Sequence, residues 1–281
     1  MKVLGTRLFA ARGDERERTV LVSDLHLPAV RSAVHDWFEE LLARAREQAA
    51  KTRILILGDL FDVWVNDRQR TLPAWDRTIA ALRETTDRSV IVDVIVGNRD
   101  YMLGAAFARA AGVVVRRGGL LATLAGVRTV LLHGDELCLR DRPYQRVKPI
   151  LRSLPVRGVL AAMPRALALR LASRARKVSQ DVQARGRTSP ESALRYEATA
   201  EAIETAFRVT AAMRLIYGHV HRPSRTRLAE DREVLVLPAF DEAGVHLTAD
   251  SEQLRFVDRY GCDHPDYPPR VPGNPRDHRS Q

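Results

Sequence analysis

The sequence predicts an α/β fold interrupted by a helical insertion, and three observations support this prediction. Short apolar or β-branched runs alternate along the chain with stretches of helical periodicity, a pattern typical of α/β proteins. Polar motifs directly follow five of these runs. A segment at residues 141–200 breaks the alternation, and residues 140–190 carry the excess positive charge of the chain.

Five of the short runs are bounded by glycine or aspartate, and we predict that they are buried strands. They lie at residues 19–23, 53–57, 90–96, 128–132 and 214–217. The periodicity predicts helices at residues 34–50, 72–84, 105–111 and 192–209. Later runs have no long helix between them and predict either a second sheet or an antiparallel extension; they lie at residues 234–237, 245–248 and 254–257.

The predicted insertion is basic and amphipathic. Residues 140–190 contain 13 lysines and arginines and two acidic residues, whereas the rest of the chain has 32 basic and 33 acidic residues. Apolar residues recur there at helical spacing, for example Leu160, Met163, Leu167 and Leu171. Arginines on one face of a helix often only solvate that face. Surface helices usually mix both signs, however, and residues 142–180 contain no acid. We therefore expect an anionic partner: phosphate, nucleic acid or an anionic lipid surface.

The composition fits a reducing compartment, because the chain has only two cysteines, Cys138 and Cys262, far apart in sequence. Residues 1–12 lack the apolar core of a signal peptide. No apolar stretch approaches the roughly 20 residues that span a bilayer. We expect a cytoplasmic protein with one domain over residues 1–262, including the insertion, and a proline-rich, disordered tail at 263–281.

The polar motifs begin immediately after the predicted strands. They are Asp24-Leu25-His26, Gly58-Asp59, Gly97-Asn98-Arg99-Asp100, His133-Gly134-Asp135 and Gly218-His219-Val220-His221. Because ligands collect at the carboxyl ends of strands in α/β sheets, we expect these side chains to converge. Carboxylates, imidazoles and one amide, without thiolates, suit Mn²⁺, Fe or Zn²⁺. Seven such groups are too many for one ion and enough for two that share a carboxylate.

A two-metal centre predicts hydrolysis of phosphate esters. Two cations about 3.5–4 Å apart can hold the phosphoryl oxygens and activate a water molecule between them. Arg99 is placed to offset charge that develops on the phosphate. We expect Asp62, Asp100 and Asp135 to support the histidines and Arg99 rather than to bind metal.

The order of these motifs over residues 19–260 resembles that of the calcineurin-like metallophosphoesterases. This resemblance implies a four-layer αββα sandwich with a helical cap insertion. It also implies that Asp24, His26, Asp59 and His221 hold one ion, and that Asp59, Asn98, His133 and His219 hold the other.

A narrower resemblance rests on the runs at 58–64, 97–104, 133–138 and 218–223 and on the pair Tyr144-Gln145. These are similar to the UDP-2,3-diacylglucosamine hydrolases of lipid A biosynthesis. The resemblance implies catalytic roles for Arg99 and His219, and contacts with substrate from Asn98, Arg99, Asp141, Ser179 and His219. Where that family has an asparagine and a lysine, this chain has Gln183 and Gly186, so we expect the contacts to come from Gln183, Arg185 and Arg187.

The resemblance implies cleavage of the pyrophosphate of UDP-2,3-diacylglucosamine, with two divalent ions, most simply Mn²⁺, at the cytoplasmic face of the inner membrane. A nuclease or nucleotide phosphodiesterase is the alternative, because basic charge also suits nucleic acid. Single-strand binders usually interleave aromatic residues, however, and Tyr144 is the only one from 140 to 190. A non-catalytic scaffold of this fold would lack metal ligands, and all seven are present. We therefore expect neither nucleic acid nor an obligate protein as partner.

Overall fold

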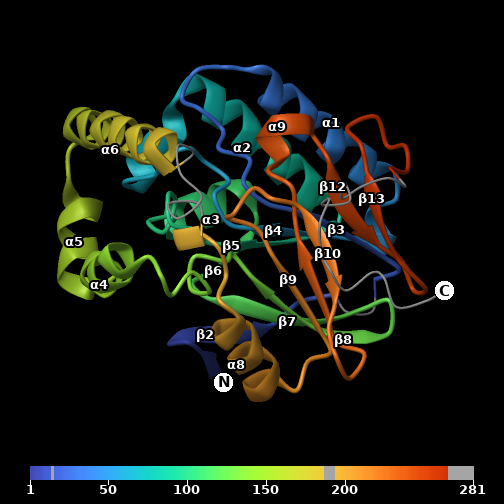
Figure 1. Cartoon of the computed structure of the whole chain (residues 1–281). Helices are drawn as coiled ribbons and strands as arrows, with labels where there is room; N and C mark the ends of the chain where they lie inside the picture. The colour runs from blue at the N-terminus through green and yellow to red at the C-terminus, as the bar shows by residue number, and fades with distance from the viewer. Residues whose placement is uncertain (14–15, 187–193, 265–281) are drawn as a thin grey trace.

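The computed structural model describes residues 1–13, 16–186 and 194–264, with the backbone alone at 178–186. Two β-sheets lie face to face within it (Figure 1). One sheet has six strands in the order β13-β12-β3-β4-β5-β6. Its parallel strands are β3 (Arg18–Val22), β4 (Thr52–Leu57), β5 (Ile91–Ile95) and β6 (Val114–Arg116), and β12 (His246–Ala249) and β13 (Leu254–Val257) extend it antiparallel.

The second sheet has seven strands in the order β1-β2-β7-β8-β9-β11-β10. Strands β8 (Val127–Leu132), β9 (Arg214–Tyr217) and β11 (Glu233–Val236) run parallel at its centre. The other strands are β1 (Lys2–Val3), β2 (Thr6–Ala10), β7 (Gly119–Leu124) and β10 (Ser224–Arg227). The strands that precede the polar motifs are thus divided between the two sheets.

Helices cover the outer face of each sheet and complete four layers. Helices α1 (Ala33–Glu47), α2 (Pro73–Asp87) and α3 (Ala105–Ala111) pack on the six-stranded sheet, and α8 (Ala200–Thr210) packs on the seven-stranded sheet (Figure 1). On β3, Val20 and Val22 face the helices while Leu21 faces the opposite sheet. Burial of each such side chain contributes about 1.5–3 kcal/mol. The predicted αββα sandwich is confirmed.

The three late strands fit both alternatives that the sequence left open, a second sheet and an antiparallel extension. Strand β11 joins the seven-stranded sheet, whereas β12 and β13 form an antiparallel extension of the six-stranded sheet. A short helix, α9 (Phe240–Ala243), connects them, and two short 3₁₀ helices lie at Ala49–Lys51 and Asp67–Thr71. Of the helix predicted at 192–209, residues 192 and 193 lie outside the described residues and 194–195 are helical. Helix α8 begins only at Ala200, where the Thr199 side chain accepts a hydrogen bond from the Ala202 N–H and caps it.

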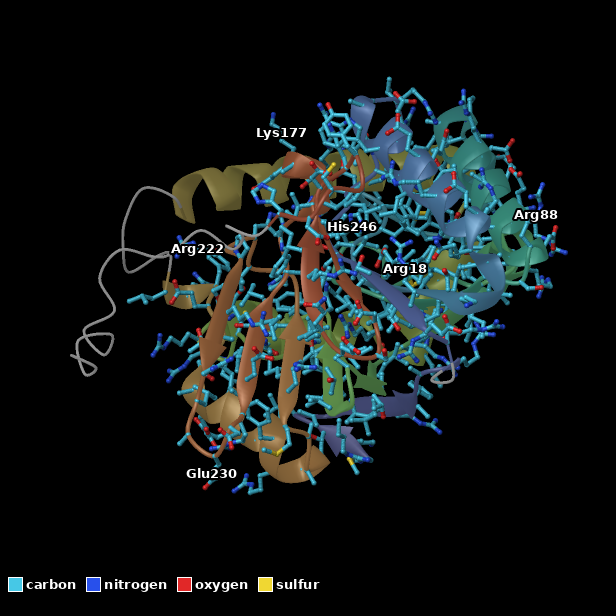
Figure 2. All side chains as sticks on the ribbon, turned by 90° about the vertical axis from the view of Figure 1, so that its right-hand side faces the viewer. Arg18, Arg88, Lys177, Arg222, Glu230 and His246 are labelled. Atoms are coloured by element: carbon cyan, nitrogen blue, oxygen red, sulfur yellow. The ribbon has the colours of Figure 1, made fainter. Side chains whose placement is uncertain are left out.

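Up to residue 186, the described part of the predicted insertion forms the helices α4 (Arg142–Leu151), α5 (Leu154–Ala162) and α6 (Arg165–Gly186). We refer to them together as the cap. They project beyond the sheets at the left of Figure 1. Lys177 of α6 lies at the periphery, whereas His246 of β12 is buried within the fold (Figure 2). The predicted tail from residue 265 onward lies outside the described residues. No helix in the described part of the chain is long and apolar enough to cross a membrane.

Candidate metal centre

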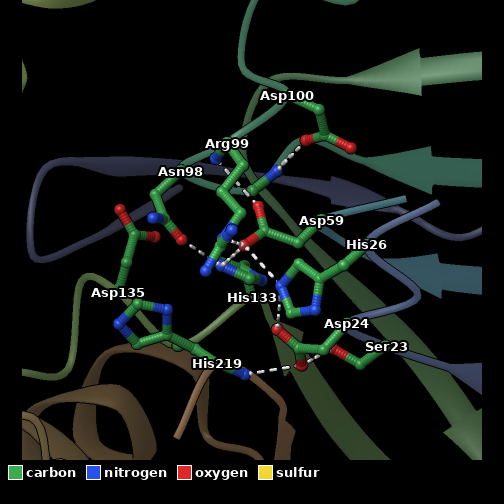
Figure 3. Close-up of polar contacts among 12 residues, drawn as sticks. Ser23, Asp24, His26, Asp59, Asn98, Arg99, Asp100, His133, Asp135 and His219 are labelled. Atoms are coloured by element: carbon green, nitrogen blue, oxygen red, sulfur yellow. Dashed lines mark hydrogen bonds and ion pairs between the residues drawn. The ribbon is translucent and has the colours of Figure 1, made fainter. Parts of the chain in front are cut away.

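All seven predicted ligands lie on loops at the carboxyl ends of five strands, and Figure 3 shows six of them facing one another. The loops follow β3, β4, β5, β8 and β9. Five of these residues have left-handed backbone, with φ between 43° and 68°: Asp24, His26, Asp59, His219 and His221. Such strained conformations in residues other than glycine cluster at functional sites, where the surrounding structure holds them. The backbone is thus shaped to aim these side chains inward.

One group of candidate ligands centres on Asp24. Its Oδ2 accepts hydrogen bonds from Ser23 Oγ (2.5 Å) and from the backbone N–H of His219 (2.8 Å). Its Oδ1 lies 3.3 Å from His221 Nε2 and 3.9 Å from His26 Nε2. One oxygen is therefore fixed by the protein, and the other faces two imidazole nitrogens.

The second group meets the first at Asp59. Asp59 Oδ2 lies 3.4 Å from His26 Nε2 and 3.7 Å from His133 Nε2, so it stands between the two groups. His133 Nε2 lies 2.9 Å from Asn98 Oδ1, and its Nδ1 lies 2.9 Å from the backbone oxygen of Leu57. The ring of His219 lies 5.0 Å from that of His133, centroid to centroid. Asp59 Oδ2 therefore lies near one histidine of each group.

The donor atoms fit divalent cations. Asp24 Oδ1 and His26 Nε2 are buried yet form no hydrogen bond. Buried polar atoms without a partner are costly unless something else satisfies them. The candidate ligand atoms form two sets, and within each set all atoms lie within 4.8 Å of one another. One set comes from Asp24, His26 and His221, and the other from Asp24, Asp59 and His133. Oxygen and imidazole donors at this spacing are suited to two ions of the Mn²⁺, Fe or Zn²⁺ type.

The electrostatics of the site favour a bound cation. Burial opposes charge on His26, but the hydrogen bond of Nδ1 with Asp241 and the nearby Asp59 carboxylate outweigh it and raise the pKa of His26 to about 10. Burial would also raise the pKa of Asp24, yet His221 and the other histidines hold it well below its usual range. Burial and the neighbouring His133 lower the pKa of His219 to about 4, which leaves that ring neutral and its lone pair available. A metal ion would take the place of the protons held here.

Asp100 braces the loops that carry Asp59 and Asn98. Its carboxylate accepts hydrogen bonds from the backbone N–H groups of Gly97 and Leu60, each at 2.7 Å. It therefore binds backbone rather than the histidines or Arg99 that we expected. A Cβ on Gly97 would lie 2.0 Å from Asp59 Oδ1, so glycine is required for this close approach.

Arg99 is held by carboxylates and links the site to the cap. Its Nη1 donates to Asp62 Oδ1 at 3.0 Å, as expected, and its backbone N–H donates to Asp59 Oδ1 at 2.9 Å. The other oxygen of Asp62 lies 2.8 Å from Arg176 Nε on α6. One carboxylate thus connects the predicted catalytic arginine with the cap.

The structure describes only some of the residues that we predict to contact substrate. Asp141 caps α4 by accepting from the Tyr144 N–H, and it forms an ion pair with Arg195 at 2.9 Å. Ser179, Gln183 and Arg185 belong to α6, but their side chains lie outside what the structure describes. Arg187 lies outside the described residues altogether.

Sequence reasoning missed Asp241 of α9. Its Oδ2 lies 2.9 Å from His26 Nδ1, and it thereby orients the ring of a predicted ligand. The two residues are 215 positions apart. No motif marks Asp241, so only the fold identifies it.

Solved structures with a similar fold include a dimetal phosphatase from Danio rerio, which is 13% identical with a TM-score of 0.46. That match covers 86% of this chain and 96% of the other. A predicted phosphoesterase from Streptococcus pneumoniae is 12% identical with a TM-score of 0.43, over 89% of this chain and 93% of the other.

No family model matched the chain. Curated relatives match most of its length, however. A UDP-2,3-diacylglucosamine hydrolase from Nitrosococcus oceani is 33% identical over 243 residues, which is 85% of this chain and 94% of that protein. Proteins of the same name from Sodalis glossinidius and Shewanella baltica are each 34% identical, over 80% and 85% of this chain and 91% and 96% of theirs. The chain belongs to the UDP-2,3-diacylglucosamine hydrolase family.

Proposed function

We propose that this protein hydrolyses the pyrophosphate bond of UDP-2,3-diacylglucosamine to give UMP and 2,3-diacylglucosamine 1-phosphate. The observation that carries this proposal is the agreement between the name of relatives matched over most of the chain and a buried cluster of metal-binding groups suited to phosphoester chemistry. The basic cap beside the cluster supports an acyl-sugar nucleotide as substrate, because such a molecule carries both phosphate and apolar chains.

We assign one metal to Asp24, His26, Asp59 and His221, and the other to Asp59, Asn98, His133 and His219. Their separation into two groups around Asp59 Oδ2 supports this assignment. We propose Mn²⁺ in both, with Fe and Zn²⁺ as alternatives that the same donors accept. When bound, the ions supply Lewis-acid polarisation of the phosphoryl group and activation of water.

The side chains of the site have separate tasks in this proposal. Arg99, held by Asp62 at 3.0 Å, offsets negative charge that grows on the phosphate. His219 and Asn98 bind substrate as well as metal, as the family resemblance implies. Asp141, Ser179, Gln183, Arg185 and Arg187 contact the nucleotide and sugar.

The cap supports association with a membrane surface on its cytoplasmic side. Large apolar side chains of the cap are exposed: Val147, Ile150, Leu154, Val159, Leu167 and Leu171. They alternate with lysines and arginines along the same helices. Apolar side chains of this kind insert at the acyl boundary while cations meet anionic headgroups.

The test is an assay of the purified protein with synthetic UDP-2,3-diacylglucosamine in detergent micelles. We expect release of UMP that stops with a chelator and returns with Mn²⁺. No UMP under any of Mn²⁺, Fe²⁺ or Zn²⁺ would overturn the proposal. Cleavage of single-stranded DNA or RNA under the same conditions would instead support the phosphodiesterase alternative.

A further inference from the structure

The first helix of the cap is held mainly by polar contacts. Helix α4 contains no buried residue, and none of its side chains belongs to the three apolar clusters among the described residues. A helix that buries little apolar surface gains little stabilisation from the hydrophobic effect. The position of α4 must therefore depend on its hydrogen bonds and ion pairs.

Most of these contacts converge on the carboxylate of Asp135. Its Oδ2 accepts a hydrogen bond from Tyr144 Oη at 2.6 Å and lies 2.7 Å from Lys148 Nζ and 3.1 Å from Arg152 Nη2. The Asp135 side chain is only 2% exposed. Because its three partners recur every four residues, they line one face of α4. Asp135 thus serves the cap and not the histidines, contrary to our expectation from the sequence.

The same helix face is bonded to the loops that carry two candidate ligands. Asp135 follows His133 by two residues, and Gln145 Nε2 donates to the backbone oxygen of Asp135 at 2.7 Å. Arg152 Nη2 also donates to the backbone oxygen of Gly97 at 3.3 Å, next to Asn98. Figure 3 shows Asp135 on the side of the site where Asn98 and His219 lie. The cap is therefore attached directly to the edge of the site.

We propose that Asp135 is a positioning residue that holds α4, the first helix of the cap, against the metal centre and thereby sets the affinity for the lipid-bearing substrate. A cap that is free to move presents its apolar face and its arginines at variable distances from the metals. Substrate then binds more weakly, while the hydrolytic groups themselves keep their places. The proposal rests on the proposed function only in its choice of substrate, because the attachment of the cap can be measured without any substrate.

The test compares Asp135→Asn with Asp93→Asn. Asp93 is a matched control, because it is a fully buried carboxylate between two arginines, Arg12 and Arg116, on β5. The first measurement is limited trypsin digestion of the metal-loaded protein, with cleavage in residues 142–177 followed by mass spectrometry. We expect Asp135→Asn to be cleaved there about tenfold faster than wild type, which corresponds to 1.4 kcal/mol. Asp93→Asn should be cleaved at the wild-type rate.

The second measurement separates KM from kcat with UDP-2,3-diacylglucosamine. We expect Asp135→Asn to raise KM about tenfold with a much smaller change in kcat, because it weakens binding and spares the chemical step. Lys148→Met should shift both measurements in the same direction, and it tests the proposal if Asp135→Asn does not fold.

If trypsin cleaved the cap of Asp135→Asn and of Lys148→Met at the wild-type rate, the proposal would be overturned. A fall in kcat at constant KM, together with less bound metal, would overturn it too and assign Asp135 to the metal centre. If the wild-type protein releases no UMP, the proposed function fails, and the digestion still decides whether Asp135 anchors the cap.

Discussion

The two ends of the β-sandwich differ in whether their buried charged groups have partners within the protein. At the carboxyl ends of the strands, Asp24 Oδ1 and His26 Nε2 are buried without hydrogen bonds, on left-handed backbone. At the amino ends, the buried charges are paired. Arg214 Nε lies 2.7 Å from Glu233 Oε2, at the first residues of β9 and β11.

Arg53 shows how complete the pairing is at the amino end. Its side chain is buried in β4, where Nε donates to Thr19 Oγ1 at 2.6 Å and Nη2 donates to the backbone oxygen of Thr123 at 3.1 Å. Thr19 and Thr123 belong to different sheets, so this arginine joins them. Its polar groups serve the fold itself.

The difference teaches where to look for a ligand. A buried charge with a full set of partners is neutral or costly for stability but needs nothing further. A buried carboxylate and a buried imidazole that each keep one atom without a hydrogen bond indicate a group that the protein alone does not supply. We refer to the carboxyl end, with Asp24 and His26, as the incomplete end, and to the amino end, with the paired Arg53, Arg214 and Glu233, as the complete end.

The largest effect should come from Asp59→Asn at the incomplete end. The amide offers only one ligand oxygen to two ions, so we expect loss of metal and a fall in kcat/KM on the order of a thousandfold or more, about 4 kcal/mol of transition-state stabilisation. Metal content and UMP release measure this. Thermal unfolding of the metal-free variant should resemble that of chelated wild type, and a large further loss of stability would contradict the distinction between the ends.

The complete end should respond in the opposite way. Glu233→Ala leaves Arg214 buried beside an empty space, and we expect it to lower the free energy of unfolding by about 3 kcal/mol. Urea unfolding measures this. Metal content and kcat of the folded variant should match wild type, and a selective loss of metal would show that the two ends are coupled.

The pH dependence of that effect has a definite sign. Burial raises the pKa of Glu233, but Arg225 and Arg214 outweigh it and lower the pKa below the ordinary value of 4.5. Because the folded pKa is depressed, the stabilisation is present above pH 4.5 and is lost as the pH falls through the folded value. The difference between wild type and Glu233→Ala should therefore shrink below about pH 4.5.

A smaller effect is expected from Asp241→Asn, which changes the side-chain contact with His26 and leaves the backbone hydrogen bond from the Asp241 N–H to Asp24 in place. Removing the charge at His26 Nδ1 weakens the orientation and basicity of that ring, so metal affinity should fall by about 10- to 100-fold. Titration of the metal-free protein with Mn²⁺ measures this. An unchanged affinity would mean that the 2.9 Å contact does not orient the ring.

Much of the fold could be predicted because the five strands before the motifs are buried on both faces and bounded by turn residues. The division into two sheets could not, since continuous apolar runs do not reveal which neighbour each strand pairs with. Three edge strands, β1, β6 and β10, were missed because they are short or exposed. Strand β2, next to β1, and the hairpin strand β7 were missed with them.

The candidate site also has one part that could be predicted from the sequence and one part that could not. Strand-end position was enough to bring the candidate ligands together, because it depends only on local sequence and sheet geometry. The roles of Asp241, Asp100 and Asp135 depend on partners that the fold supplies: a histidine 215 residues away, backbone N–H groups and a helix of the cap. Local sequence carries no signal for such contacts.

The smallest effect is expected from Ser23→Ala, which tests how the incomplete end is held. Ser23 Oγ donates to Asp24 Oδ2 at 2.5 Å, and the His219 N–H donates to the same oxygen at 2.8 Å. Loss of one of two such bonds should cost about 1 kcal/mol and weaken Mn²⁺ binding roughly fivefold. Metal titration measures this, with Thr210→Ala as control, because the Thr210 hydroxyl bonds only with the backbone of Ala206 and Ala212 at the C-terminal end of α8 among the described residues. If Ser23→Ala bound metal as wild type does, the His219 N–H alone would suffice to orient Asp24, and the free oxygen would owe its position to the backbone.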